Sequence, residues 1–231
     1  MFIKNELHYC DYLPRGLDNL AVLLKGTSLE KLPEYSDQFE HCLIVSDYDD
    51  ELAMIGKSLQ DKNIIHFTNR SKQASLSKKN YKKYNISNIQ LGQVFRLNHY
   101  RLMESMIHYK LMGIQLNVHS LPEKLLSYGE GLGEEYSLKF PNTGILSLIY
   151  SLEMIRPRNL WVFGLDFYST PYMAKQVQSS PIGLDGQAGK LGRLDLLNYV
   201  YSLFRRFPET NINMVSYYPG WPAISNMSRV L

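Results

Sequence analysis

Short apolar segments alternate with helix-like segments along most of the chain, and this alternation limits the folds open to it. Five runs of four or five mostly apolar residues are bounded by polar or turn residues, as is typical of strands buried on both faces. They are Leu20–Leu24, Cys42–Val45, Ile64–Phe67, Leu160–Phe163 and Ile212–Val215. Four longer stretches have the pattern of helices: Glu51–Gln60, His99–Met112, Gly144–Ile155 and Lys190–Phe207.

Strand and helix signals that alternate in this way predict an α/β protein with an open, mostly parallel sheet. We expect a Rossmann-like sheet flanked by helices, with residues 1–231 in a single domain. The loosely composed, lysine-rich stretch 71–87 is expected to leave this domain as an excursion. Hydrophobic residues make up 45% of the chain and charged residues 20%, which supports one large core and excludes wholesale disorder.

Several classes of location are disfavoured by the same sequence. No apolar run approaches the roughly 18 residues that cross a bilayer, and the N-terminal segment MFIKNELHYCDYLPRG is too polar for a signal peptide. Two cysteines, Cys10 and Cys42, cannot build a disulfide framework. We therefore expect reduced thiols and a cytoplasmic protein.

Positive charge is concentrated in one interval, although the net charge is only +3. No acidic residue lies between Asp61 and Glu104, where lysines and arginines recur. Such an interval offers a positive surface to phosphates, to anionic or lipid-linked glycans and to nucleic acid, and favours peripheral contact with the inner face of a membrane; a solvated lysine-rich loop is the alternative. No helix-turn-helix, zinc knuckle or aromatic-rich RNA motif accompanies it, so no nucleic-acid partner is expected.

Ligands of open parallel sheets bind at the carboxyl ends of the strands, and two turns there have the composition of anion sites. Residues 26–28 (Gly-Thr-Ser) and 142–144 (Asn-Thr-Gly) each open a helix-like segment. Backbone N–H groups at such helix starts bind phosphates, although many turns of this kind are ordinary caps. Neither a Walker loop nor the Gly-x-Gly-x-x-Gly motif occurs.

Asp47 and Asp49 form an Asp-x-Asp triplet after the second predicted strand. Two carboxylates so spaced can bind a divalent cation that bridges a nucleotide diphosphate. Acidic residues also favour a helix N-terminus, so a structural role stays open. The six histidines show no clustered ligand spacing and Gly-x-Ser-x-Gly is absent, so neither a zinc site nor a serine hydrolase is expected.

A third group of polar residues follows the strand at 160–163. Gly164 allows a ligand to approach the backbone closely, and Tyr168 and Tyr172 lie shortly after it. Two phenols at a strand end can donate hydrogen bonds to a leaving phosphate without a metal. The aromatic residues can equally cap the core.

In this order, the segments resemble the bacterial sialyltransferases of glycosyltransferase family 42, which sialylate lipooligosaccharide. The likeness is closest over residues 141–172, beginning PNTGILSLIYSLEMIRPRNLWVFGLDFYST, which is also similar to the small sialyl motif of eukaryotic sialyltransferases. The segment LLKGTSLEKL resembles the family's opening Gly-x-Gly-Pro-Ser-Leu turn, with Lys25 where a small or amide residue is usual. The segment TNRS matches a strand end where the family has an asparagine against the nucleotide, here Asn69.

The resemblance implies an inverting, metal-independent glycosyltransferase without a cofactor. Its donor would be a CMP-sugar carrying sialic acid or a related 2-keto sugar such as Kdo, and its acceptor a glycan. By this resemblance Tyr168 and Tyr172 hold the leaving phosphate, and Asp185 stands where the family has its general-base histidine. The expected nucleotide-binding residues are Gly26, Ser28, Asp47, Asn69, Thr143, Gly144, Gly164 and Asp166.

Two other functions stay open at this point. One is a metal-dependent transferase for a nucleotide-diphosphate sugar, with the cation on Asp47 and Asp49. The other is a catalytically silent nucleotide-sugar or glycan-binding protein, which keeps the tyrosines and lacks the histidine.

Overall fold

The computed structural model describes residues 16–68, 75–94, 99–113, 117–121, 125, 142–167, 169, 172–175 and 193–231. Within these residues, eight strands form one sheet in the order β5-β4-β3-β2-β1-β6-β7-β8, and all neighbouring strands are parallel. The strands are β1 (Asn19–Leu23), β2 (His41–Val45), β3 (Asn63–Thr68), β4 (Asn88–Val94), β5 (Asn117–Leu121), β6 (Asn159–Phe163), β7 (Asn211–Val215) and β8 (Met227–Arg229).

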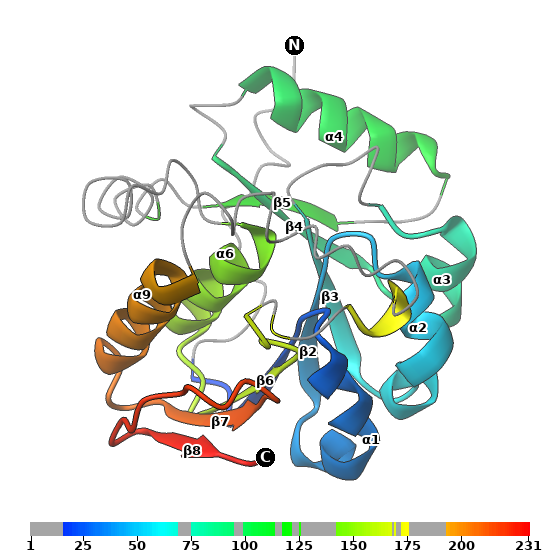
Figure 1. Ribbon diagram of the computed structural model, residues 1–231. Helices are drawn as coiled ribbons and strands as arrows, with labels where there is room; N and C mark the ends of the chain where they lie inside the picture. Colours follow the sequence, from blue (N-terminus) through cyan, green and yellow to red (C-terminus); the bar gives the residue numbers. More distant parts are fainter. Residues whose placement is uncertain are drawn as a thin grey trace.

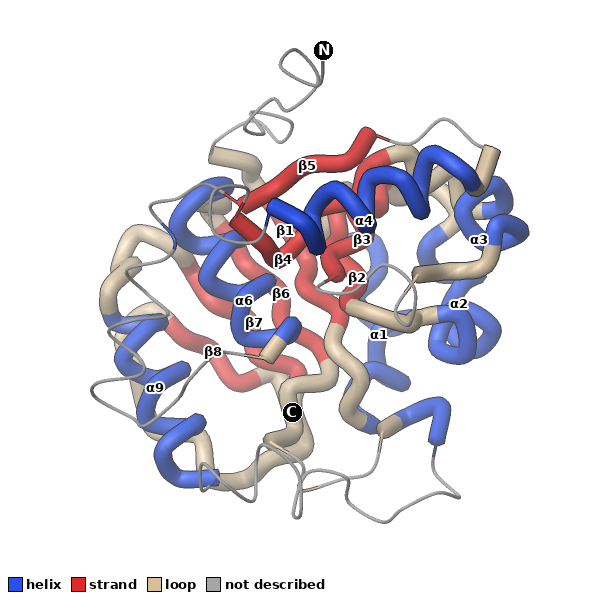
Figure 2. Tube along the Cα trace, turned by 90° about the horizontal axis from the view of Figure 1, so that it is seen from above, coloured by secondary structure: helices blue, strands red, loops and turns tan. Residues whose placement is uncertain are grey.

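Helices cover both faces of this sheet, so it is a doubly wound, Rossmann-like α/β arrangement. The α-helices of the described residues are α1 (Leu32–Tyr35), α2 (Asp49–Ile55), α3 (Lys78–Lys83), α4 (His99–Leu111), α6 (Thr143–Tyr150) and α9 (Arg193–Arg205). Shorter turns of helix are η1 (Thr27–Lys31), η2 (Ser36–Gln38), η3 (Gly56–Leu59), η5 (Ser151–Ile155) and η6 (Met173–Lys175). Helices α6 and α9 lie on one face and α1, α2 and α3 on the other (Figures 1 and 2).

The direction of winding reverses between β1 and β6. From β1 the chain runs outward to β5, then returns to β6 beside β1 and continues through β7 to β8. At such a reversal the connections diverge to opposite faces and leave a crevice outside the carboxyl ends of the two strands. The fold therefore marks the β1–β6 junction as the place for a ligand.

The sequence identifies the central strands because both of their faces are covered. Leu20, Ala21, Val22 and Leu23 of β1 are fully buried, and an unbroken apolar run is typical of such a strand. The five predicted strands are confirmed as β1, β2, β3, β6 and β7. The sequence does not predict β4 or the two edge strands β5 and β8, because they are less uniformly apolar, as in NIQLGQV of β4 and MSR of β8.

The predicted helices are also present, with some differences at their ends. The prediction over 99–112 corresponds to α4, and that over 144–155 to α6 followed by a π-helical turn that ends at Arg156 with φ +53°. The prediction over 190–207 corresponds to α9 within the described residues. The prediction over 51–60 corresponds to α2, which already begins at Asp49, and to the 3₁₀ turn η3, which follows it from Gly56.

The lysine-rich stretch does not leave the domain where the structure describes it, so the predicted excursion is wrong for residues 75–87. This segment contains α3, the crossover helix between β3 and β4. Tyr81 and Tyr84 are buried, and the Tyr84 hydroxyl donates to the Leu52 carbonyl at 3.1 Å. Buried tyrosines on one side of α3 leave its lysines on the other. No helix of the described residues is both long and apolar enough to cross a membrane.

Candidate functional site

A cavity of about 340 Å³ opens at the carboxyl ends of β1, β2 and β6, where the winding reverses. This volume lies at the small end of the roughly 300–1,000 Å³ range of small-molecule sites. Its wall is formed by Leu24, Lys25 and Gly26 after β1, Val45, Ser46 and Asp47 at β2, Asn142 to Ile145 at the start of α6, Gly164 to Phe167 after β6, and Tyr172 and Leu196.

The backbones of β1 and β6 come together closely on one side of this cavity. The Gly26 N–H donates to the Gly164 carbonyl at 2.9 Å. Gly164 has φ +72°, and a Cβ there would lie 2.6 Å from the Leu24 carbonyl oxygen. A Cβ on Gly26 would lie 2.5 Å from the Asp166 carboxylate. Both positions therefore require glycine, for conformation at Gly164 and for space at both.

Asp166 fixes the part of the rim that follows β6. Its buried carboxylate accepts hydrogen bonds from the Ser28 N–H at 2.9 Å and the Ser28 hydroxyl at 2.7 Å. It also accepts from the Ser216 hydroxyl at 3.0 Å and the Tyr217 N–H at 2.9 Å. One side chain thus joins the segments that follow β1, β6 and β7. Ser28 is fully buried in this contact and does not line the cavity.

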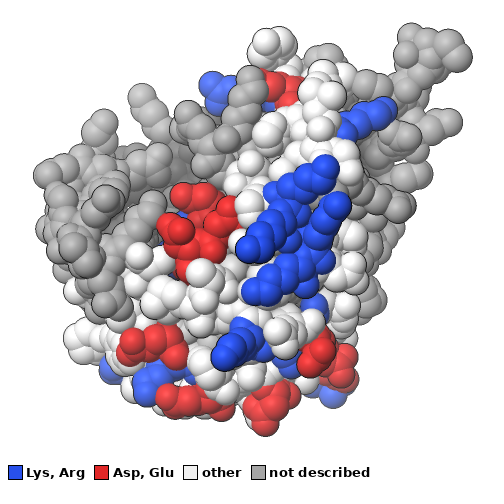
Figure 3. Space-filling view, turned by 90° about the vertical axis from the view of Figure 1, so that its right-hand side faces the viewer, with Lys and Arg blue, Asp and Glu red and all other residues white. Residues whose placement is uncertain are grey.

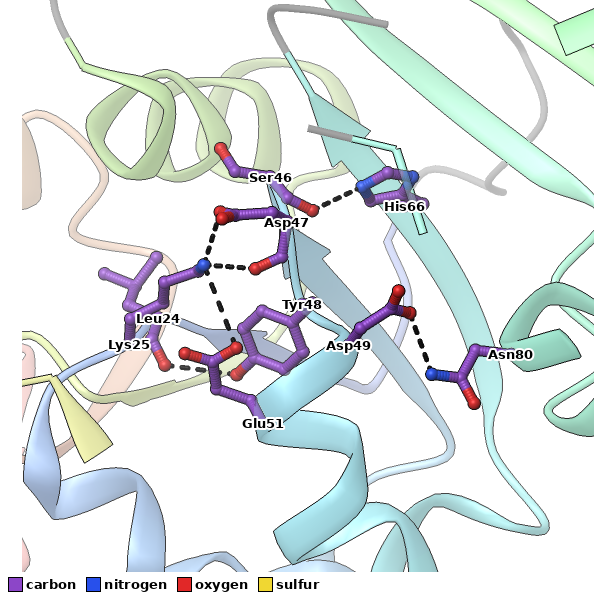
Figure 4. A network of polar contacts seen from close by, with 9 residues as sticks. All are labelled: Leu24, Lys25, Ser46, Asp47, Tyr48, Asp49, Glu51, His66 and Asn80. Atoms are coloured by element: carbon purple, nitrogen blue, oxygen red, sulfur yellow. Dashed lines mark hydrogen bonds and ion pairs between the residues drawn. The ribbon is translucent and has the colours of Figure 1, made fainter. Parts of the chain in front are cut away.

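Charge on the β2 side of the cavity comes from Lys25, Asp47 and Glu51 (Figure 4). The Lys25 ammonium pairs with the Asp47 carboxylate at 2.5 Å, donates to the Asp47 carbonyl, and lies 3.8 Å from Glu51. The Asp47 side chain is 52% exposed, whereas that of Glu51 is 2% exposed. Burial raises the pKa of Glu51, and the charge of Lys25 partly offsets this. Asp47 is therefore the carboxylate that a ligand can reach.

The position of Asp47 depends on a buried histidine. Ser46 has φ +58°, an uncommon conformation that turns the chain at the end of β2. The Ser46 carbonyl lies 2.7 Å from His66 Nε2, and His66 Nδ1 lies 2.7 Å from the Tyr81 hydroxyl. Burial lowers the pKa of His66 to about 4, so the ring is neutral at pH 7. The neutral ring donates from Nε2 to the carbonyl and accepts from Tyr81 at Nδ1.

Helix α6 begins at the cavity and brings backbone donors to it. The Asn142 side chain accepts from the Ile145 N–H at 2.9 Å, and the Asn142 carbonyl from the Leu146 N–H at 2.9 Å. The N–H groups of Thr143 and Gly144 have no acceptor among the residues that the structure describes. Free N–H groups and the positive end of the helix dipole together favour an anion.

Tyr172 reaches the cavity through the segment before η6. It forms an antiparallel bridge with Gly26, and the following Met173 N–H donates to the Lys25 carbonyl at 2.8 Å. The half-buried Tyr172 lines the cavity. A phenol is thereby placed in the wall that also contains the start of α6.

Most of the predicted binding residues within the described ranges meet in this one cavity. They are Gly26, Asp47, Thr143, Gly144, Gly164, Asp166 and Tyr172. Asn69, Tyr168 and Asp185 lie outside the described residues. The sequence pattern did not reveal the support of Ser46 by His66 and Tyr81, because no spacing marks a contact between a strand and the next helix. Lys25 could have been found from the sequence, because a cation directly after a buried strand indicates a position at the ligand-binding edge of the sheet.

Asp47 and Asp49 do not face a common ligand. The Asp49 carboxylate accepts from the Ser77 N–H at 2.8 Å and the Asn80 amide at 2.8 Å, so it points toward α3 and away from Asp47 (Figure 4). Tyr48 between them is buried and donates to the Leu24 carbonyl at 3.1 Å. Across the described ranges no three His, Cys, Asp or Glu side chains gather as metal ligands do.

Neither a protein-family model, nor a curated protein, nor a solved structure matches this chain. The cavity itself therefore supplies the grounds for a function.

Proposed function

We propose that the protein is a glycosyltransferase that uses a CMP-sugar, sialic acid or a related 2-keto sugar being the group transferred. The observation that carries the proposal is the cavity at the β1–β6 junction, where the start of α6, Asp47 and Tyr172 meet. The resemblance of residues 141–172 to family 42 sialyltransferases supports the same reading, because this segment provides both the start of α6 and Tyr172.

The two sides of the cavity suit the two polar parts of a nucleotide. The donor phosphate would accept hydrogen bonds from the N–H groups of Thr143 and Gly144 and from the Tyr172 phenol. The ribose hydroxyls would donate to Asp47, since an acid near the end of the second strand binds ribose in many doubly wound folds. Lys25 keeps Asp47 in place through their ion pair.

The proposed reaction is a single inverting displacement. The acceptor hydroxyl attacks the anomeric carbon, the bond from that carbon to the phosphate oxygen breaks, and CMP leaves with the bonding electrons. Tyr172, together with Tyr168 by the resemblance, donates hydrogen bonds that strengthen as negative charge grows on the phosphate. Asp185 takes the proton of the acceptor hydroxyl. A glycan acceptor and a cytoplasmic location are part of this proposal.

A thermal-shift panel tests the choice of donor. We expect CMP or CDP to raise the melting temperature in excess EDTA, because a ligand stabilises the fold by RT ln(1 + [L]/Kd). The panel compares CMP, CDP, UDP and GDP, each with EDTA and with Mn²⁺. A shift produced only by UDP or GDP, and only with Mn²⁺, would contradict the proposal and favour the metal-dependent transferase.

Variants of the reacting groups test the chemistry. We expect Tyr172→Phe to lower kcat by about 10²–10³ and to leave the fold and most CMP affinity unchanged. Asp185→Asn should lower kcat by a factor of about 10²–10⁴ and should also spare CMP binding. The measurement is CMP release from a CMP-sugar, with and without a glycan acceptor. If the wild-type protein binds CMP but cleaves no CMP-sugar, it is the catalytically silent binder.

A further inference from the structure

Helix α4 has apolar side chains on the side that faces away from the sheet. Tyr100, Ile107 and Leu111 are 81%, 53% and 80% exposed. Their spacing of seven and four residues places them on one side of the helix. Leu102 and Tyr109 lie on the opposite side and are fully buried. The outward side of a surface helix is normally polar, so this apolar stripe needs another explanation.

Basic side chains lie along both borders of the stripe. Within α4, Arg101 and Lys110 are exposed. Helix α3 adds four exposed lysines: Lys78, Lys79, Lys82 and Lys83. Figure 3 shows a band of positive charge on this side of the molecule. The positive charge of α3 adjoins the C-terminal end of α4, because the Lys78 ammonium lies 3.5 Å from the position that a Cβ on Gly113 would occupy, two residues after α4.

We name this combination of the apolar stripe with the six basic residues the α3–α4 surface. Glu104 is the single acidic residue within α3 and α4; its spacing from Tyr100 and Ile107 places it on the same side of α4 as the stripe, where it is half buried. Acidic side chains gather beside the lysines in Figure 3, and Asp50 at the start of α2 is exposed. The α3–α4 surface is therefore positive along α3 and α4 and bordered by negative charge toward α2.

We propose that the α3–α4 surface docks on an anionic lipid bilayer. Tyr100, Ile107 and Leu111 enter the boundary between headgroups and acyl chains, while the lysines of α3 contact the lipid phosphates. An apolar helix face with basic borders is the pattern of interfacial membrane helices, and each lysine near an anionic surface adds affinity. A nucleic acid would use the positive charge alone and would leave the apolar stripe in water. The docking proposal does not depend on the function proposed for the cavity.

Sedimentation of the full chain with lipid vesicles tests this docking. We expect binding to equimolar phosphatidylcholine and phosphatidylglycerol, weaker at high salt, and no binding to phosphatidylcholine alone. The double variant Ile107→Ser/Leu111→Ser should weaken binding at least about tenfold, because it removes the inserted side chains. Lys79→Glu/Lys82→Glu should also weaken binding at least about tenfold.

A matched control separates position from net charge. Arg205→Glu/Arg206→Glu, at the last residue of α9 and the residue after it, changes the net charge by the same amount as the lysine variant. Helix α9 lies on the opposite face of the sheet from α3 (Figure 1). We expect this control to bind vesicles like the wild type. Circular dichroism and melting of every variant confirm that a loss of binding is not a loss of fold.

Three results would overturn the docking proposal. In the first, the wild type ignores anionic vesicles. In the second, one part of the surface has no effect: either the lysine variant binds no more weakly than the α9 control, or the serine variant binds like the wild type. In the third, the wild type is a dimer that the serine variant dissociates while neither binds lipid, which would assign the stripe to a second copy of the chain.

Discussion

Two aspartates at the rim of the cavity occupy comparable places in the fold and have opposite surroundings. Asp166 follows β6, is 2% exposed and accepts four hydrogen bonds from Ser28, Ser216 and Tyr217. Asp47 follows β2, and its side chain is 52% exposed and paired with Lys25. The β6 side of the rim is thus built into the fold, whereas the β2 side presents a carboxylate to the cavity.

This difference shows how one cavity can be both rigid and able to bind. Fixing the β6 side in advance means that a ligand does not have to order it on binding, which favours affinity. On the β2 side, the half-exposed Asp47 carboxylate costs little to rearrange. Asp166 therefore supports the cavity, and under the proposed function Asp47 is the aspartate that contacts the ligand. The same residue type, placed after a strand, has two different functions.

The largest expected effect separates the two aspartates by stability. Asp166→Ala should lower the free energy of unfolding by about 4 kcal/mol, because it removes a buried carboxylate and leaves the N–H groups of Ser28 and Tyr217 without their acceptor. Asp47→Ala should cost less than about 1 kcal/mol, since the Asp47 carboxylate is half exposed and Lys25 keeps Glu51 as a partner at 3.8 Å. Denaturation by urea measures both. Equal losses in the two variants would contradict the division of the rim.

The second prediction concerns the β2 side and its dependence on pH. His66 has a pKa of about 4 in the fold because it is buried, against about 6.5 in an unfolded chain. As the pH falls from about 6.5 to about 4, the unfolded chain takes up a proton that the folded chain does not. Stability should therefore fall by about 3 kcal/mol over this window from His66 alone, and be unaffected by it above about pH 6.5.

The variant His66→Gln isolates this contribution. We measure the free energy of unfolding by urea denaturation between about pH 6.5 and about pH 4. It should fall less steeply with decreasing pH in the variant than in the wild type, because unfolding of the variant takes up as much as one proton fewer. Carboxylates elsewhere titrate in both proteins and cancel in the difference. Identical slopes would mean that His66 titrates normally in the fold and does not support Ser46 as a neutral ring.

The sequence was sufficient for those parts of the fold whose environment is uniform along a segment. The apolar runs of β1, β2, β3, β6 and β7 show their burial directly. The start of α6 is predictable because the capping contact is local: the Asn142 side chain accepts from the Ile145 N–H three residues later. The strands β4 and β8 carry polar residues, and their pairing depends on neighbours distant in the sequence.

The roles of individual site residues were harder to predict, for the same physical reason. Gly-Thr-Ser at 26–28 looked like a phosphate turn, but the Ser28 hydroxyl bonds to Asp166, 138 residues away. The Asp-x-Asp triplet resembles a single metal site, but Tyr48 between the two acids is buried and the carboxylates point to different partners, Asp47 to Lys25 and Asp49 to α3. Such roles depend on contacts between distant segments, which no local spacing records.

The most direct test of the central claim, that the start of α6 binds the phosphate of a cytidine nucleotide, is a calorimetric titration with CMP of the variant Thr143→Pro. Thr143 is the first residue of α6, a position where proline suits the helix, so this change removes one N–H donor and spares the fold. Thr143→Ala is the control that keeps the N–H and removes the hydroxyl.

We expect the Kd for CMP to rise at least about tenfold in Thr143→Pro and to change much less in Thr143→Ala, because a hydrogen bond to a charged group contributes about 1.5–3 kcal/mol. The affinity for cytidine, which has no phosphate, should be the same in all three proteins. An unchanged Kd for CMP in Thr143→Pro would contradict the claim.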